Sequence, residues 1–332
     1  MIDYLECRVI AAPEKWSFGR RVIVKSLGRL IKKSGVVWYN RDSAYNETVA
    51  AMRWLKKSGQ IFHFIYGENS FRYLGLLKKI HLQNAVICTF HTPPWKFQEL
   101  VADNKYLDDL DAIVVVSNSQ RKFFSELIGE ERVFYVPHGI DVQHYHPKMV
   151  FLTHNSTTKF KCLFVGQHMR DLNTLSESAK FLIDHDPTVE FNVVVPEKFH
   201  SCFIDLPNVT VLSKIPDTRL LELYQESDLL VLPLIDATAN NSILEAMACG
   251  LPVVTTDMTA TRDYLDDSCA ILTPKGDVRG VVEAIQALKS DRDKLDGFAG
   301  AIRRRAMDFS WEKIATQMNH IYRKVSDGCH QS

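Results

Sequence analysis

Short apolar segments rich in β-branched residues alternate along the chain with longer segments of helical periodicity. The apolar runs are 7–11, 36–39, 61–66, 85–90, 112–117 and 133–136 in the first half, and 161–165, 191–195, 209–212, 229–232, 253–256 and 270–272 in the second. Uninterrupted apolar runs are typical of parallel strands that are buried on both faces. Strands separated by helices indicate right-handed βαβ units. The pattern therefore predicts an α/β protein with two Rossmann-like, doubly wound domains.

The stretch 138–159 is polar and rich in turn-forming residues, so we predict that the linker between the two domains lies there. In open α/β sheets, ligands bind beyond the carboxyl ends of the strands. Two such domains that face each other enclose a central cleft. We therefore expect the chemistry at residues that directly follow strands.

The composition fits a globular protein: the 332 residues are 46% apolar and 24% charged, which excludes a disordered chain. No apolar run approaches the roughly 18 residues that a membrane-spanning helix needs. The N-terminal sequence MIDYLECRVI contains acids and lacks the layout of a signal peptide. The seven cysteines are scattered without a Cys-x-x-Cys pair. We therefore expect a reduced, cytoplasmic protein with no disulfide and no zinc site.

The net charge of zero, from 40 basic and 40 acidic residues, is a cancellation between the two halves. Residues 1–150 contain 21 basic and 15 acidic residues, and the excess lies within the first 60. Residues 17–34 have the pattern of an amphipathic helix, with bases along one side: Arg21, Lys25, Arg29, Lys32 and Lys33. Such a helix binds the anionic inner face of a membrane, or is an ordinary solvated helix packed on the sheet. Both interpretations stay open, and we expect no nucleic-acid partner.

Residues 240–256, with the sequence NNSILEAMACGLPVVTT, give the strongest local signal. Asn240 and Asn241 can cap a helix that ends at Gly250, a natural residue for the position after a helix. Because this helix follows a predicted strand, its N-terminus lies at the carboxyl edge of the sheet, where free amides favour a phosphate group. Glu245 lies one turn in, where it either accepts hydrogen bonds from sugar hydroxyls or merely faces solvent.

The sequence EAMACGLPVV at 245–254 resembles the signature of the retaining GT-B glycosyltransferases of the group-1 family, glycosyltransferase family four. The resemblance extends over most of the chain. Residues 107–147 resemble the last strand and loop of the family's N-domain and its crossing to the C-domain, and 164–166 resemble the glycine turn that opens the C-domain. Residues 220–233 resemble the helix and strand before the signature, and 309–312 resemble the start of the closing helix.

This resemblance implies a GT-B fold with an acceptor-binding domain at 1–147 and a nucleotide-sugar-binding domain at 148–308. A C-terminal helix at 309–326 would pack back on the first domain. The implied reaction transfers a sugar from a UDP- or GDP-sugar to a glycan or lipid-linked acceptor with retention of configuration. It would serve the biosynthesis of a surface polysaccharide or glycolipid, with no metal or other cofactor required.

On the donor side, the resemblance implies that Glu245 holds the nucleotide ribose. The family's first signature Glu falls at position 237, which is Ala237 here, and the adjacent Asp236 is our candidate to replace it. The candidates for binding the donor phosphates or sugar are the backbone amides of Asn240, Asn241 and Ser242.

The family also has an Arg directly after the C-domain glycine and a Lys five residues later, both near the leaving diphosphate. Here Gly166 is followed by Gln167, and the Lys position is Leu172. We predict that Arg170 takes the cationic role, because a departing diphosphate needs positive charge nearby. The alternative is an exposed loop Arg paired with Asp171. Less direct helpers would be Lys198 and Lys214.

On the acceptor side, His91 follows a strand in the sequence Thr-Phe-His-Thr-Pro-Pro and matches a family His near the reacting centre. We therefore predict that His91, Arg170 and Glu245 carry catalysis. Residues expected to line the acceptor side are Gly19, Tyr66, Glu68 and Trp95.

Other enzyme classes lack support in the sequence: no G-x-G-x-x-G or P-loop motif is present, and no cluster has metal-ligand spacing. The sequence Asp109-Leu110-Asp111 precedes a strand, so we do not interpret it as a metal site. Two alternatives remain open. One is a GT-B-type nucleotide-sugar epimerase or phosphorylase. The other is a weakly active sugar-nucleotide-binding subunit, suggested by Ala237, Gln167 and Leu172.

Overall fold

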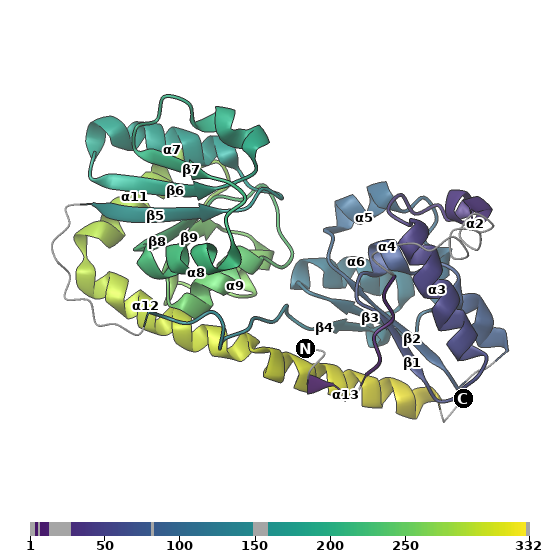
Figure 1. Cartoon of the computed structure of the whole chain (residues 1–332). Coiled ribbons are helices and arrows are strands. Elements are labelled where there is room, and N and C mark those ends of the chain that lie inside the picture. Colours follow the sequence, from purple (N-terminus) through teal and green to yellow (C-terminus); the bar gives the residue numbers. More distant parts are fainter. Residues whose placement is uncertain (1–3, 6, 13–27, 81–82, 149–158, 330–332) are drawn as a thin grey trace. The chain divides into compact units, whose positions relative to one another are not determined.

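The computed structural model describes residues 4–5, 7–12, 28–80, 83–148 and 159–329. The chain forms two compact units, one of Met1–Pro137 with Ile314–Ser332 and one of His138–Lys313. Each unit has its own parallel sheet (Figure 1) and its own hydrophobic core. Most of the predicted basic helix lies outside the described residues.

The first unit is built on a four-stranded sheet in the order β1-β2-β3-β4, with every neighbouring pair parallel. The strands are β1 Ile61–Phe64, β2 Ala85–Phe90, β3 Ala112–Val115 and β4 Val133–Tyr135. The central strands β2 and β3 are buried at every residue, as their uninterrupted apolar runs predicted.

Helices and 3-10 segments precede β1 and connect the strands of this sheet. They are α2 Gly28–Lys33, α3 Arg41–Trp54, α4 Gly67–Ser70, α5 Pro94–Leu100 and α6 Asn118–Ile128, with the 3-10 segments η2 Leu74–Lys79, η3 Lys105–Asp109 and η4 Glu130–Arg132. Two of them begin with side-chain caps that the sequence supplies: Asn40 caps α3 and Ser117 caps α6.

Two runs predicted as strands in this half do not form them, so that part of the prediction was wrong. Residues 7–11 make no ladder and are mostly exposed, so they bury too little apolar surface to hold a strand in place. Val36 makes a single antiparallel bridge with Val101. The run cannot continue because Asn40 already caps α3.

The second unit is built on a six-stranded parallel sheet in the order β10-β9-β8-β5-β6-β7. Each strand coincides closely with a predicted run: β5 Phe160–Val165, β6 Val189–Val194, β7 Val209–Leu212, β8 Leu229–Leu232, β9 Val253–Thr256 and β10 Ala270–Thr273. The chain runs outward from β5 through β6 and β7, then returns to place β8 on the other side of β5. The order therefore reverses between β5 and β8, and the carboxyl ends of these two strands form the topological switch point.

The helices of the second unit form two groups around this sheet (Figure 1). In one group α7 packs against α11, and in the other α9 packs against α8 and α12. They are α7 Leu172–His185, α8 Asp217–Glu226, α9 Asn241–Cys249, α10 Thr259–Arg262, α11 Val278–Ser290 and α12 Arg292–Ala306, with the 3-10 segments η5 Glu197–Phe203 and η6 Met307–Phe309. The last helix, α13 Trp311–Cys329, begins in the second unit and belongs to the first from Ile314 onward.

Within the part of the chain that the structure describes, no helix combines the length and the apolar character needed to cross a membrane.

Candidate functional site

Two loops meet at the switch point of the second sheet. One follows β5 at 166–171, and the other follows β8 at 233–240. Backbone hydrogen bonds join them, because Asp171 N donates to Pro233 O (2.9 Å) and Ile235 N donates to Met169 O (2.9 Å). The residues that follow β5 and β8 are therefore held together where open α/β sheets bind ligands.

Helix α9 begins at the end of the second loop, as predicted. Its N-cap residue Asn240 is extended, and Asn240 Oδ1 accepts a hydrogen bond from Ile243 N (3.3 Å). Gly250 ends the helix in the left-handed conformation, with φ of 70°. The amides of Asn241 and Ser242 have no acceptor within the helix, so the positive end of its dipole lies at the carboxyl edge of the sheet.

Arg170 is held against this helix N-terminus by four oxygen atoms. Nε donates to Val165 O (3.0 Å), and Nη1 donates to His168 O (3.1 Å). Nη2 donates to Asn240 Oδ1 (3.2 Å) and to Ser242 Oγ (3.1 Å). Burial lowers the pKa of Arg170 to about 10, which leaves the side chain cationic at neutral pH. A fixed cation thus lies beside the positive end of α9.

The turn at Gly166 makes room for this guanidinium. Gly166 has φ of 98°, and a Cβ added there would lie 3.1 Å from Arg170 Nη2. The alternative partner of Arg170, Asp171, instead caps α7, with Oδ1 accepting from Thr174 N (3.0 Å). The exposed Arg170–Asp171 pair considered from the sequence does not form.

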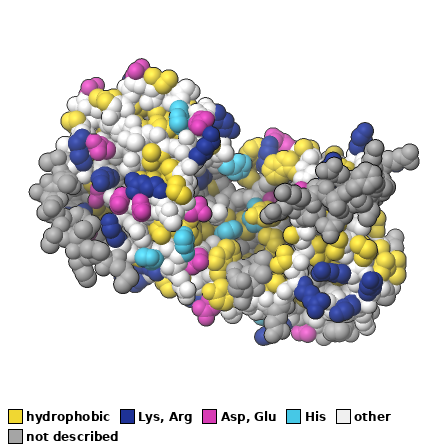
Figure 2. All heavy atoms as spheres, viewed as in Figure 1, with side chains coloured by type: hydrophobic (Ala, Val, Ile, Leu, Met, Phe, Trp, Pro, Cys, Tyr) yellow, Lys and Arg dark blue, Asp and Glu magenta, His cyan; other side chains and the backbone are white. Residues whose placement is uncertain are grey.

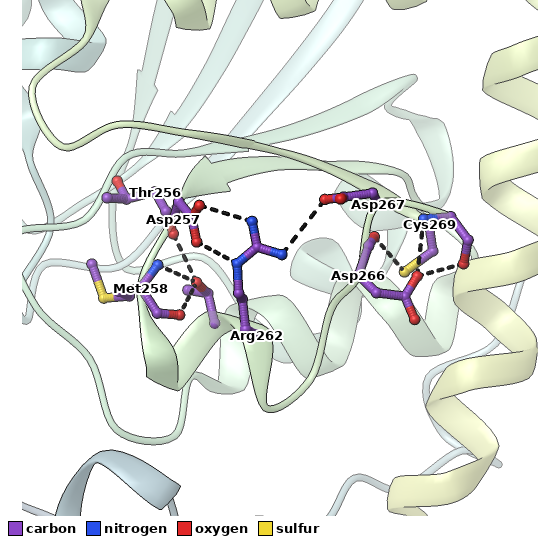
Figure 3. Close-up of polar contacts among 9 residues, drawn as sticks. Thr256, Asp257, Met258, Arg262, Asp266, Asp267 and Cys269 are labelled. Carbon is purple, nitrogen blue, oxygen red and sulfur yellow. Dashed lines mark hydrogen bonds and ion pairs between the residues drawn. The ribbon is translucent and has the colours of Figure 1, made fainter.

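A second arginine at the same edge of the sheet is bound differently (Figure 3). Arg262 follows β9 and forms two hydrogen bonds to Asp257, at 2.6 Å and 2.8 Å, with Asp267 at 3.7 Å. Among the described residues, no carboxylate lies within ion-pair distance of Arg170. Arg262 is thus paired with acids, whereas the four oxygen atoms that accept hydrogen bonds from Arg170 are uncharged.

Glu245 points into the interior of the unit rather than simply into solvent. Its Oε2 accepts a hydrogen bond from Tyr224 OH (2.8 Å), and Tyr224 on α8 is fully buried. Burial raises the pKa of Glu245, while hydrogen bonds from Tyr224 and Tyr145 and the charge of Arg170 lower it. Neither tyrosine has a distinguishing signal in the sequence, because only tertiary structure brings α8 and Tyr145, within the stretch 138–159, to Glu245.

Two of the predicted donor residues have contacts elsewhere. Lys214 follows β7, is exposed, and its Nζ pairs with Glu197 at 2.9 Å. Asp236 lies in the loop after β8, where Oδ1 accepts from the neighbouring amide of Ala237 (2.7 Å). The structure thus gathers Arg170, Asn240, Ser242 and Glu245, while Lys214 has a surface partner of its own.

In the first unit, the ends of β1 and β2 bring His91, Glu68 and Tyr66 together. His91 N donates to Glu68 Oε1 (3.2 Å), and His91 Nδ1 lies 3.7 Å from the same oxygen. The rings of Tyr66 and His91 pack with centroids 4.6 Å apart. Trp95 on α5 is exposed, with the Lys96 ammonium 5.6 Å from its ring centroid. Gly19, also predicted on the acceptor side, lies outside the described residues.

Over the described ranges, no group of three or more His, Cys, Asp or Glu side chains is arranged to hold a metal ion. Asp111, from the Asp-Leu-Asp sequence, binds Lys78 Nζ (2.6 Å) and accepts a hydrogen bond from Val86 N (2.7 Å). Its carboxylate oxygens therefore serve contacts within the first unit.

The chain is similar to known proteins over most of its length. Residues 159–291 match the family described as Glycosyl transferases group 1. A phosphatidyl-myo-inositol mannosyltransferase of Mycolicibacterium smegmatis is 24% identical over 270 residues, which cover 76% of this chain and 68% of that protein. A D-inositol 3-phosphate glycosyltransferase of Corynebacterium urealyticum is 22% identical, over 68% of this chain and 59% of that protein. The chain thus spans about six to seven tenths of these relatives.

Solved structures share the fold. Sucrose-phosphate synthase from Thermosynechococcus elongatus matches with a TM-score of 0.68 at 18% identity, over 97% of this chain and 83% of that one. Anabaena Alr3699/HepE, in complex with UDP and glucose, matches with a TM-score of 0.65 at 14% identity, over 91% of this chain and 83% of that one. These likenesses confirm the predicted fold class.

Proposed function

Since the chain carries a group-1 glycosyltransferase domain on a GT-B fold, we propose that it is a retaining glycosyltransferase. It moves a sugar from a UDP- or GDP-sugar, bound by the second unit, to a glycan or lipid-linked acceptor, bound by the first. The pathway is the biosynthesis of a surface polysaccharide or glycolipid. The observation that carries the proposal is Arg170, a half-buried cation held at the N-terminus of α9.

The geometry around Arg170 suits a departing diphosphate. Negative charge develops on the phosphate oxygens as the bond to the sugar breaks, and fixed positive charge lowers the energy of that state. Arg170 and the dipole of α9 supply this charge before the reaction begins. The present acceptors of Nη2 are neutral oxygens, and an anionic phosphate oxygen is the stronger acceptor. A diphosphate therefore gains free energy by binding there.

Glu245 serves the ribose in this proposal. A carboxylate accepts hydrogen bonds from two neighbouring hydroxyls, and Tyr224 OH holds one of its oxygens in place. Tyr224 also limits the rotation of the carboxylate, because its own ring is fixed in the core. In this proposal Glu245 thus binds the nucleotide and does not act as a nucleophile.

Retention of configuration follows from positioning in this proposal. The acceptor hydroxyl attacks from the face that the diphosphate leaves, and His91 with Glu68 contributes the polar groups on the acceptor side. The proton of that hydroxyl passes to an oxygen of the departing phosphate. The rate gain then comes from orientation and leaving-group stabilisation.

The test is a thermal-shift panel of UDP-, GDP-, ADP- and dTDP-sugars. A donor at about 100 times its Kd adds about 2.7 kcal/mol to the free energy of unfolding, so the cognate donor raises Tm measurably. We expect Arg170→Gln to weaken that binding at least about tenfold, the loss of one charge-assisted contact. Arg279→Gln is the matched control, because Arg279 is exposed on α11 and paired with Glu283.

The outcomes separate the alternatives. No shift with any donor contradicts the proposal, as does an equal loss of binding in both arginine variants. A shift without turnover on any acceptor favours the binding subunit. Turnover of the nucleotide sugar in the absence of an acceptor favours the epimerase.

A further inference from the structure

Gln120 lies on α6 of the first unit and is fully buried. A buried amide is costly unless all its polar atoms are paired, and this one is paired completely. Its Oε1 accepts from Val116 N (3.0 Å) and Ser117 N (3.1 Å). Its Nε2 donates to Phe90 O (3.0 Å) and Thr92 O (2.9 Å). One side chain thus binds the backbone at both strand ends, β2 and β3.

These contacts lie just where the sheet stops. The last paired residues of β2 and β3 are Phe90 and Val115. Beyond them the two chains separate, β2 toward α5 and β3 toward α6, so the backbone groups there lose their ladder partners. The amide of Gln120 takes the place of the missing ladder.

His91 lies between the two carbonyls that Gln120 holds. The carbonyls before and after it, of Phe90 and Thr92, accept from Nε2, while its own amide donates to Glu68 Oε1 (3.2 Å). The backbone of His91 is therefore fixed by side chains from α6 on one side and α4 on the other. This fixes the direction in which its ring leaves the chain.

Capping of α6 does not account for this arrangement. Ser117 Oγ accepts from Ser119 N (3.2 Å), and Gln120 Oε1 closes the capping box at Ser117 N. A Glu in that position closes a capping box equally well. Unlike a carboxylate, the amide of Gln120 can donate hydrogen bonds, and both bonds that its Nε2 donates go to the backbone on either side of His91.

We propose that Gln120 is a positioning residue of the transferase reaction, which sets the orientation of His91 by holding both flanking carbonyls. The proposal rests on the proposed function, in which His91 lies at the reacting centre. It predicts that the donor hydrogen bonds of Gln120, and not its acceptor bonds, matter for turnover.

The decisive variant is Gln120→Glu. The carboxylate keeps the capping box but faces the two carbonyls with no hydrogen to donate. We expect kcat to fall by about 10- to 100-fold, as for other small misplacements of reacting groups. The Kd for the nucleotide sugar should stay within about twofold, because no contact of the proposed nucleotide-sugar site is changed. Lowering the pH protonates the carboxyl and restores one donor, so the kcat ratio of variant to wild type should recover toward acidic pH.

Asn84→Asp is the matched control. Asn84 is also fully buried in this unit, and it precedes β2 at the opposite end of that strand. Its Nδ2 donates to Trp54 O (3.2 Å) and Lys57 O (2.8 Å), and its Oδ1 accepts from Gln60 N (2.8 Å). The substitution removes two donor bonds of the same kind. We expect a loss of stability with kcat and its pH profile unchanged.

The ring signals of His91, in protein labelled with ¹³C-histidine, report the orientation without turnover. They are assigned by their disappearance in His91→Asn. We expect Gln120→Glu to displace them and Asn84→Asp to leave them in place. Gln120→Met, which has similar volume and no charge, should displace them as well, and it replaces Gln120→Glu if the carboxylate prevents folding.

Unmoved His91 signals in the Gln120 variants overturn the proposal, as does an equal fall of kcat in Asn84→Asp. If His91→Asn keeps full turnover, the role of His91 in the proposed function fails, and Gln120 is then no positioning residue of the reaction. Displaced signals together with a kcat loss confined to the Gln120 variants support the proposal.

Discussion

Glu68 places a carboxyl group inside the first unit, with its side chain 4% exposed. Its Oε1 accepts from His91 N, and among the described residues its Oε2 has no hydrogen-bond partner. Burial raises the pKa of Glu68 to about 7, although hydrogen bonds from the amides of Glu68 itself and His91 lower it. At neutral pH the group therefore exists in both protonation states, and in the proposed reaction it would either donate a hydrogen bond to the acceptor hydroxyl or accept one from it.

The raised pKa makes stability depend on pH. Between about 4.5 and about 7, the folded protein holds a proton that the unfolded chain has released, so the free energy of unfolding falls as the pH rises through this window. Glu68→Gln does not titrate there. We expect the variant to gain up to roughly 3 kcal/mol relative to wild type between pH 4.5 and pH 8. Urea unfolding across that range measures the difference, and parallel profiles for the two proteins would contradict the prediction.

At the scale of elements, helix α3 is tied to the start of η2 by one buried carboxylate. Glu47 Oε2 accepts from Tyr39 OH (2.5 Å). Its Oε1 accepts from three successive backbone amides, those of Arg72 (2.9 Å), Tyr73 (2.5 Å) and Leu74 (2.7 Å). Burial raises the pKa of Glu47, and these hydrogen bonds lower it. The contact fixes the segment that connects β1 to β2. Glu68 lies near the start of the same segment.

We expect Glu47→Ala to lower the free energy of unfolding by at least about 3 kcal/mol, because it leaves buried amides without an acceptor. Glu126→Ala is the control, since Glu126 is 65% exposed on α6 and lies 4.0 Å from Lys122. That change should stay within about 0.5 kcal/mol. Chemical denaturation of both variants measures the two effects. A small effect at Glu47, equal to that at Glu126, would show that η2 is held by other contacts.

For the whole molecule, the zero net charge hides an uneven distribution. Figure 2 shows Lys and Arg side chains gathered on the first unit with few acids among them, while both signs mingle over the second. The described part of the predicted basic helix is α2, which ends in the exposed residues Lys32 and Lys33. We propose that this basic segment attaches the protein peripherally to the anionic inner face of a membrane, where a lipid-linked acceptor would be found.

The proposal is tested by replacing four bases of the predicted basic helix by Gln: Lys25, Arg29, Lys32 and Lys33. Each base near an anionic surface contributes about 1 kcal/mol, so binding to phosphatidylglycerol-containing vesicles should weaken at least about tenfold. The donor-induced thermal shift should not change. The control replaces as many exposed bases of the second unit: Arg219, Arg279, Arg292 and Lys294. Equal vesicle binding by the two variants would leave the charge asymmetry without this role.

The sequence predicted those parts of the molecule whose causes are local. The strands of the second unit and the helix from Asn241 to Cys249 follow from apolar runs, an N-cap and a C-terminal glycine, all of which act within a few residues. The two failed strands, at 7–11 and 36–39, are also mostly apolar. A strand also needs a neighbour to pair with, and the composition of a segment does not say whether it has one.

The site residues show the same division. Position relative to a motif was enough to name Arg170 and Glu245 as candidates, but each had two interpretations from the sequence. The structure added partners remote in the chain: Asn240 binds Arg170 across 70 positions, and Tyr224 binds Glu245 across 21. Gln120 had no distinguishing signal, because its bonds to Phe90 and Thr92 exist only where β2 and β3 end side by side.

The sequence by itself thus determined the class of fold, the helix that follows β8 and the identity of its first residues. Only the tertiary structure decided which side chains hold one another. Helix periods and caps are properties of neighbouring residues, whereas a buried hydrogen bond depends on which strands lie next to each other. Strand order belongs to the whole sheet, and in this protein it reverses between β5 and β8, where Arg170 meets α9.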